Sequence, residues 1–299
     1  VLMRLARGSG VDGLAGMAMQ RDVYRHPLGA PGLTSAEYDG VLPPKEDALP
    51  GFAVLRPCLE MTRAELRHYA TVLKGRWVED PTNEDRTYDR VRVRQLLNLL
   101  GEEGVTADRL VDTATRMARA QGGLRARLAD AVDHVCVDAP LGQVQMRRDA
   151  FAALDAETQL RLLSAALRYV SSSEYRPRAA STETLLERLL SGGGGTLHGA
   201  DICVGSEEFR FMREFAAVRD VTAKAGTLWD AQWVLAADDL SDACVVRALG
   251  DDGWRQLSDR DCLPIPHRQA LSLPSVWQND NLVACPMLGV RSDVQANRY

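Results

Sequence analysis

The stretch WVEDPTNEDRTYDRVRVR, residues 77–94, gathers carboxylates, turn-forming residues and spaced arginines in one short segment. Asp80 stands before a proline, which favours a turn, and Asn83 can hydrogen-bond the backbone beyond it. Arg90 and Arg94 are four residues apart, so a helix would place both guanidinium groups on one face, one turn apart. Two planar cations aimed together suit phosphate oxygens. We therefore predict a binding site here; the alternative is a polar loop that runs into a solvated helix.

A helix is predicted directly before this segment. Thr62 and Glu65 are spaced as a capping box, and Gly75 can end the helix. Apolar residues recur with helical spacing at Leu66, Tyr69, Ala70 and Leu73. We expect Tyr69 and Leu73 to lie in the core. The helix would then deliver the chain straight into the predicted site.

Two long regions flank these elements. Residues 21–57 are rich in proline, glycine and short polar residues without a sustained period, which predicts a long loop or insertion. Residues 104–190 predict a helical region whose charged faces could meet RNA or simply water. Its helices are expected to begin at Thr106, at Asp155 and at Ser181 or Thr182. The first helix carries a core stripe of Leu110, Ala114, Met117, Leu124, Leu128, Ala131 and Val135.

The pattern changes at the four glycines of residues 192–195. These glycines follow a helix and lack the Lys-Ser/Thr ending of a phosphate loop, so they predict a flexible turn. After them, alternating or short apolar runs separated by turn residues predict β-strands. The expected strands span residues 196–204, 209–214, 232–236 and 244–249. The tryptophans of this region, Trp254 and Trp277 among them, are interpreted as packing residues.

Composition favours a soluble, intracellular protein. The 299 residues are 45% hydrophobic and 26% charged, without an apolar run long enough to cross a bilayer and without a secretory leader. Six cysteines lie scattered, without the local spacing of a zinc site, which indicates small buried residues in a reducing compartment and no metal centre. They are Cys58, Cys136, Cys203, Cys244, Cys262 and Cys285.

Charge gives a mixed indication about nucleic acid. The net charge of −5 argues mildly against it. Arginine nevertheless supplies nearly all the positive charge, because only Lys45, Lys74 and Lys224 are lysines, and the arginines cluster locally. Such stripes could bind RNA phosphates, although a GC-rich genome would produce the same preference for arginine.

Residues 80–94 resemble the Asp-x-Ser/Thr-Asn, aromatic, Arg, Arg signature of bacterial tRNA(Ile)-lysidine synthetases. These enzymes use ATP to attach lysine to the wobble cytidine of an isoleucine tRNA. Other segments resemble the family's motifs in the same order along the chain. They are RGSG at residues 7–10, GLAGM at 13–17, LRP at 55–57, LPSVW at 273–277 and ACPMLG at 284–289.

The resemblance implies an architecture. Residues 1–103 would be the α/β remnant of a PP-loop ATP pyrophosphatase domain with a Rossmann-like fold. Residues 104–191 would form a helical tRNA-binding domain, and residues 192–299 a mixed, β-rich C-terminal domain. The expected substrates are ATP with Mg²⁺, L-lysine and the isoleucine tRNA with a CAU anticodon. A cytoplasmic location follows from this role, and a homodimer is one possible assembly.

It also implies roles for individual residues. Arg90 and Arg94 would bind the α-phosphate or the nucleotide, while Asp80 and Asn83 would fix the loop that presents them or contact the lysine amine. The loop of Arg7, Gly8, Ser9 and Gly10 would contact phosphate or RNA. Arginines expected to contact tRNA are Arg56, Arg116, Arg119, Arg125 and Arg127.

Two family motifs are missing from the sequence. The family's Ser-Gly-Gly-x-Asp-Ser phosphate loop and its His-His-x-Asp-Asp element do not occur, and the chain opens on Val1. We therefore expect a fragment that is inactive alone. The first alternative is another PP-loop tRNA-modifying enzyme, such as a thiolase, although Cys58 is the only cysteine in the first third. The second is a non-catalytic RNA-binding fragment.

Overall fold

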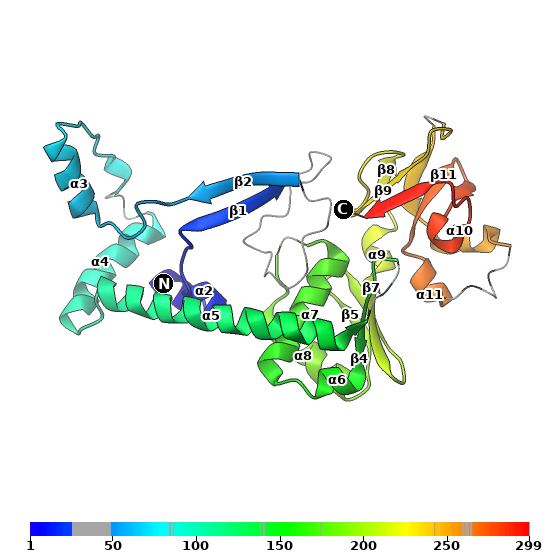
Figure 1. Cartoon of the computed structure of the whole chain (residues 1–299), viewed down its shortest axis with the longest axis horizontal. Helices are drawn as coiled ribbons and strands as arrows, with labels where there is room; N and C mark the ends of the chain where they lie inside the picture. The colour runs from blue at the N-terminus through cyan, green and yellow to red at the C-terminus, as the bar shows by residue number, and fades with distance from the viewer. Residues whose placement is uncertain are drawn as a thin grey trace. The chain divides into compact units, whose positions relative to one another are not determined.

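The computed structural model describes residues 1–25, 49–83, 85, 87–137, 139, 141–173, 175–241, 243–258, 260, 263 and 265–298. The chain divides into two compact units, which are described separately. Unit 1 comprises Val1–Arg21 and Ala53–Ala126, and unit 2 comprises Asp22–Phe52 and Arg127–Tyr299. The division falls inside the long helix α5 (Ala107–Val135) and also inside the strands β1 (Gln20–Arg25) and β2 (Leu49–Leu55) (Figure 1). The three domain ranges expected from the sequence remain a proposal.

Unit 1 is built mainly from helices. They are α1 (Leu2–Leu5), α2 (Val11–Leu14), α3 (Arg63–Val72), a 3-10 turn η1 (Pro81–Asn83), α4 (Asp89–Glu102) and the first part of α5 (Ala107–Val135). Strands β1 and β2 pair in a two-stranded sheet that both units share, because Asp22–Phe52 belongs to unit 2. They occupy both ends of the segment that we expected to be a loop, so that expectation is wrong there. Its middle, residues 26–48, lies outside the described residues.

Helix α3 forms as the sequence predicts. The Thr62 hydroxyl accepts a hydrogen bond from the Glu65 backbone N–H at 3.2 Å, and the Glu65 carboxylate accepts one from the Thr62 N–H at 2.7 Å. The capping box is therefore confirmed. At the other end, Lys74 takes the left-handed conformation, and the Gly75 N–H donates to the Ala70 carbonyl at 2.8 Å. The helix thus ends near the predicted residue.

The described residues cover the apolar face of α3 only in part, because Leu66 and Ala70 are half-buried. Tyr69 is 58% exposed and Leu73 is 61% exposed, so the prediction that they lie in a core is wrong. The physical reason is that the described elements of unit 1 place no complete layer against this face. Among the hydrophobic side chains described in unit 1, Val91 alone is buried. Helical spacing in the sequence identifies an apolar face but not what covers it.

The first half of unit 2 packs helices against an antiparallel sheet. The sheet has the order β3-β4-β7-β6-β5, and α7 contacts β6 and β7 while α8 contacts β5 (Figure 1). Its strands are β3 (Cys136–Val137), β4 (Val144–Arg147), β5 (Gly195–Leu197), β6 (Ala200–Val204) and β7 (Glu208–Arg213). Its helices are α6 (Arg148–Ala152), α7 (Ala156–Ser171) and α8 (Ala179–Leu190). Fully buried side chains such as Phe151, Leu163, Leu167, Leu189 and Phe211 form the core between them.

The helices around this sheet begin at or near the residues predicted from the sequence. Asp155 caps α7 by accepting from the Thr158 N–H at 3.0 Å, as predicted, and Thr106 caps α5 through the Arg109 N–H at 3.3 Å. Helix α8 begins slightly before Ser181. Strands β3 and β4 interrupt the range that we expected to be helical. Because β4 pairs with β7, one sheet contains strands from both sides of residue 191.

The second half of unit 2 is mostly β-structure. A four-stranded sheet has the order β12-β11-β10-β8, and β13 pairs with β9. The strands are β8 (Thr222–Lys224), β9 (Trp233–Ala236), β10 (Val245–Ala248), β11 (Pro274–Gln278), β12 (Asn281–Ala284) and β13 (Gln295–Arg298). Short helices α9 (Phe215–Val218), α10 (Gly250–Gln256), α11 (His267–Ala270) and η3 (Pro286–Leu288) connect them.

The predictions for this β-rich region are largely confirmed. Strands β7, β9 and β10 match three of the expected ranges to within one residue, whereas the range 196–204 contains two strands, β5 and β6, separated by a turn. Gly192, Gly193 and Gly194 connect α8 to β5, whereas Gly195 is the first residue of β5. Gly194 is required there because a Cβ would lie 2.4 Å from the Ile202 carbonyl oxygen. Trp277 is 1% exposed and packs under Arg247, whose guanidinium carbon lies 3.8 Å from the ring centroid. Its predicted packing role is therefore confirmed.

The five described cysteines are free. Cys244 and Cys285 are buried, which agrees with the expectation of small core residues, whereas Cys58 is exposed. Burial raises the pKa of the Cys285 thiol to about 12 and that of Cys136 to about 11. Both thiols therefore stay protonated at neutral pH. Cys262 lies outside the described residues.

Candidate functional site

The loop between α3 and α4 is shaped by two turns of the same kind. The Asp80 carboxylate accepts hydrogen bonds from the Thr82 N–H at 2.9 Å and from the Thr82 hydroxyl at 2.8 Å. These bonds lower the pKa of Asp80, the backbone bond contributing most. The Asp85 carboxylate accepts from the Thr87 N–H at 2.9 Å in the same way. Both carboxylates are therefore ionised and engaged in shaping the loop at neutral pH.

This geometry bears on the two roles considered for Asp80. Its oxygen Oδ1 is occupied by two bonds within the loop, which supports loop fixing over direct contact with a substrate amine. The Asn83 N–H donates to the Asp80 carbonyl at 3.0 Å and closes the 3-10 turn, which leaves the exposed Asn83 side chain facing solvent. Asp85 is not among the site residues predicted from the sequence. The repeat of Asp-x-Thr five residues later was the signal that could have identified it.

Helix α4 presents Arg90 and Arg94 to solvent. Neither guanidinium hydrogen-bonds or ion-pairs with any residue in the described part of the chain, and both side chains are exposed. Arg92, between them, is engaged: it pairs with Asp89 and donates to the Thr87 carbonyl. Because Val91 turns into the protein, the helix itself is anchored. Two unpaired guanidinium groups one helical turn apart form a strong anion-binding feature.

The structure brings the Gly-Ser-Gly loop to the start of the same helix. Arg7 Nη2 lies 3.7 Å from the Asp89 carboxylate, with both side chains more than half exposed. Gly8 has φ of +72°, a conformation that favours glycine, and a Cβ at Gly8 or Gly10 would meet no atom within 4 Å. A phosphate can therefore approach this backbone closely. Arg7 therefore lies beside the start of the helix that carries Arg90 and Arg94, and the binding roles of these arginines remain predictions.

The arginines expected to contact tRNA are not equivalent. Arg116 and Arg119 are exposed on α5 and make no ion pair with the described residues. Arg127 is engaged: its Nε donates to the Asp155 carboxylate at 2.6 Å and to the Thr158 hydroxyl at 3.2 Å. Arg125 is half-buried. It lies two residues before Arg127 on the helix, which separates the two side chains by about 200° around the helix axis, so they point to opposite faces.

Arg56 also has a structural contact. Its Nη1 donates to the Ala18 carbonyl at 3.0 Å, and its backbone N–H donates to the Met19 carbonyl at 2.8 Å. These bonds join the end of β2 to the segment before β1. A contact of Arg56 with RNA would use the remaining donors of the guanidinium.

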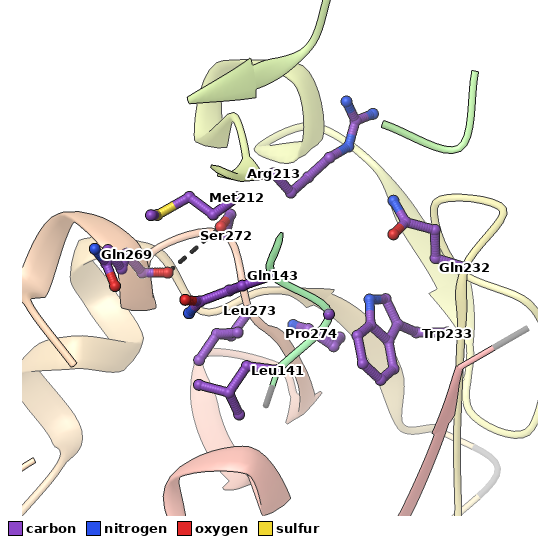
Figure 2. A pocket seen from close by; sticks show the side chains of 11 residues that line it. Leu141, Gln143, Met212, Arg213, Gln232, Trp233, Gln269, Ser272, Leu273 and Pro274 are labelled. Carbon is purple, nitrogen blue, oxygen red and sulfur yellow. Dashed lines mark hydrogen bonds between the residues drawn. The ribbon is translucent and has the colours of Figure 1, made fainter. Parts of the chain in front are cut away.

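A cavity in unit 2 lies among polar and apolar side chains from four parts of that unit (Figure 2). Gln143 is 7% exposed and makes no hydrogen bond through its side chain to a described residue, while the Ser272 hydroxyl contacts the Gln269 carbonyl at 3.5 Å. The cavity volume of about 20 Å³ admits roughly one water molecule. It is far too small for a nucleotide. The cavity is therefore part of the packing of unit 2 and does not compete with the α4 region as a candidate site.

Within the described residues, His, Cys, Asp and Glu side chains nowhere gather in a group of three that could hold a metal ion. None of the described helices is both long and apolar enough to traverse a bilayer.

Comparison with known proteins places the chain in a family. Residues 1–100 match the family model described as the PP-loop domain. The chain is 34% identical over 291 residues to the tRNA(Ile)-lysidine synthase of Ruegeria pomeroyi, an alignment that covers 97% of this chain and 62% of that protein. The chain belongs to the tRNA(Ile)-lysidine synthase family. The PP-loop match implies an α/β, Rossmann-like N-terminal fold.

Other members of the tRNA(Ile)-lysidine synthase family align similarly. The protein of that name from Wolbachia pipientis wMel is 28% identical over 303 residues, covering 95% of this chain and 62% of the relative. The one from Rhodopseudomonas palustris is 36% identical over 194 residues, covering 63% of this chain and 47% of the relative. The matched part of the chain thus spans between 47% and 62% of the length of these relatives.

Proposed function

We propose that this chain supplies the loop, helices and C-terminal region of a tRNA(Ile)-lysidine synthase, an ATP-dependent carbon–nitrogen ligase. Its substrates would be ATP, L-lysine and the isoleucine tRNA with a CAU anticodon. The observation that carries the proposal is the pair of guanidinium groups at Arg90 and Arg94, which have no partner among the described residues and follow a loop held by two Asx turns. In a chain of this family, that arrangement suits a reacting phosphate.

The reaction has two steps. The C2 carbonyl oxygen of the wobble cytidine attacks the α-phosphorus of ATP, and pyrophosphate leaves. The lysine amine then attacks C2, AMP leaves with that oxygen, and the amine gives up a proton to yield lysidine. Negative charge builds on the α-phosphate oxygens in the first step and on the departing AMP in the second. Mg²⁺ bound to the phosphates would neutralise part of this charge.

The residues of unit 1 fit the demands of these steps. Arg90 and Arg94 would bind the α-phosphate oxygens, where charge develops, and remain charged throughout because guanidinium does not deprotonate. The loop of Arg7, Gly8, Ser9 and Gly10 would bind a further phosphate through its backbone and the Arg7 side chain. Asp80 would hold the loop, and the exposed Asn83 side chain would be free to meet substrate. No covalent intermediate with the protein is required.

Recognition of tRNA would involve the arginines on α5. Arg116 and Arg119 are the better candidates, because their guanidinium groups are exposed and unpaired within the described residues. Contacts with phosphates would orient the tRNA without reading its bases. Arg125, Arg127 and Arg56 would contribute less. The ranges 104–191 and 192–299 as tRNA-binding regions, the cytoplasmic location and a homodimeric assembly belong to the same proposal.

A direct experiment incubates the complete gene product with ATP, labelled lysine and the isoleucine tRNA transcript. We expect label in tRNA in step with release of AMP and pyrophosphate, and no label with a transcript whose wobble cytidine is replaced by uridine. Binding of tRNA without lysine transfer would instead indicate a non-catalytic RNA-binding protein. Transfer of sulfur would indicate a thiolase; the exposed Cys58 alone does not favour that outcome.

A further inference from the structure

Glu79 receives three hydrogen-bond donors on one carboxylate. Arg63 Nη2 donates to Oε2 at 2.7 Å, and the Trp77 indole N–H donates to Oε1 at 3.0 Å. Arg67 Nη2 donates to the same Oε1. Glu79 directly precedes Asp80, the first residue of the segment 80–88 that leads into α4 and is called the site loop below.

The positions of these donors are set by α3. Arg63 and Arg67 lie one turn apart on that helix, so both guanidinium groups project from one face. The capping box at Thr62 fixes the start of the helix beside Arg63. Helix α3 therefore presents both arginines to Glu79 in a defined position. The other carboxylates of this region, Asp80 and Asp85, are turned inward on their own loop.

We propose that Glu79 is a positioning residue that ties the site loop to α3. Through this tie, α3 sets the position of Asp80 and hence of the arginines that follow on α4. The inference rests on the proposed function and adds to it the residue that holds the loop in place. Neither the family signature nor the local pattern assigns this role to Glu79.

The exposure of the ion pairs of Glu79 determines how much stability its removal should cost. Glu79 and its arginine partners are about half exposed, at 56% for Glu79, 58% for Arg63 and 42% for Arg67. Ion pairs in water add little to overall stability. Removing the charge should therefore leave the fold intact and release only the segment from Trp77 to Asp80. A released loop misplaces the catalytic arginines, which lowers turnover more than it weakens binding of tRNA.

The experiment compares Glu79→Gln, Glu79→Ala and Glu79→Asp with a matched control, Glu60→Gln. Glu60 is an exposed acid in the same unit and has no partner among the described residues. The first readout is quenching of Trp77 fluorescence by acrylamide in this chain, with Trp77→Phe as the reference to subtract. The buried tryptophans, including Trp229 and Trp277 at 1% exposure, contribute little quenching.

We expect the Trp77 quenching constant to rise about twofold in Glu79→Ala, with a smaller rise in Glu79→Gln, which keeps an acceptor for the indole. The melting temperature should match that of the wild type. In the complete gene product, kcat for lysine transfer should fall by roughly ten- to a hundredfold with KM for tRNA unchanged. Glu79→Asp should recover part of the loss, and Glu60→Gln should change nothing.

Three outcomes would overturn the proposed role of Glu79. Unchanged quenching in Glu79→Ala would overturn the proposal, as would increased quenching accompanied by normal kcat. A rise in KM for tRNA with kcat unchanged would also overturn it. If the wild-type gene product transferred no lysine, the proposed function would fail, while the quenching comparison would still establish whether Glu79 holds the loop.

Discussion

Arg213 and Asp230 form a two-pronged ion pair inside unit 2, with Nε to Oδ2 at 2.7 Å and Nη2 to Oδ1 at 2.8 Å. The side chains are 18% and 9% exposed. Arg213 also donates to the Gly199 carbonyl at 2.8 Å, and Gln232 donates to Asp230 at 3.0 Å. The end of β7 is thereby joined to the turn before β9.

Asp230→Ala should destabilise the protein by about 3 kcal/mol, because it leaves a largely buried guanidinium without its counter-charge. Asp252→Ala, which breaks the exposed pair between Arg255 and Asp252, is the control and should cost at most about 0.5 kcal/mol. Urea unfolding followed by circular dichroism measures both. Equal, small losses would show that water reaches Arg213 freely.

The pair of Arg127 and Asp155 should make stability depend on pH. Bonds from the Thr158 N–H, then from Arg127, lower the pKa of Asp155 in the folded protein. A carboxyl whose pKa is lowered on folding stabilises the protein above its unfolded pKa and loses that contribution as pH falls. The advantage of wild type over Asp155→Asn in urea midpoint should therefore shrink as pH decreases below about 4. A constant difference between pH 7 and pH 3 would contradict this.

Arg90→Ala and Arg94→Ala should each lower lysine transfer by about two to three orders of magnitude. Their melting temperatures should stay near wild type, because neither side chain has a partner within the described residues. Arg94→Lys, which keeps the charge but not the planar fork, should recover only part of the activity. Unfolding of the alanine variants with normal turnover by the folded fraction would show that these arginines serve structure.

Arg116→Ala combined with Arg119→Ala should weaken tRNA binding and make the salt dependence shallower. Loss of two phosphate contacts lowers the slope of log K against log salt by about 1 to 2. Arg127→Ala is the informative comparison, since its main effect should be a lower melting temperature through Asp155. Filter binding across a salt titration measures the slopes, and an unchanged slope for the double variant would remove α5 from the tRNA contact surface.

The cavity beside Gln143 should hold one ordered water. Its volume of about 20 Å³ fits one molecule, and the Gln143 side chain beside it makes no hydrogen bond to a described residue. A high-resolution crystal structure should show density within hydrogen-bond distance of this amide. Gln143→Leu should expel the water. An empty cavity, or a Gln143 side chain turned to bulk solvent, would contradict the expectation.

Local chemistry in the sequence was sufficient for several elements. The capping box at Thr62, the cap at Asp155 and the turn at Asp80 each depend on partners within three residues, so their sequence patterns carry the information. The β-rich second half of unit 2 was similarly indicated by alternating apolar residues. The pairing of Arg90 with Arg94 on one face followed from helical geometry alone.

What could not be predicted depends on partners remote in the sequence. Glu79 meets Arg63 sixteen residues away, and Arg7 meets Asp89 across most of unit 1, so neither contact has a local signature. Strand β3 has only two residues and forms because β4 pairs with it. Tyr69 and Leu73 have the spacing of core residues, yet spacing does not reveal whether another layer covers them.

The sheet that joins strands from both sides of residue 191 limits where the protein can be cut. A chain ending at residue 191 would keep β4 but lose β7, so the backbone groups that β4 offers to β7 would be left as an open edge. It would also lose Phe209 and Phe211 from the core under α7. Open edges and bared apolar surface promote aggregation. Recombinant pieces intended to isolate RNA binding should therefore retain residues 127–213 together, even though a division by helical and β-rich composition would separate them.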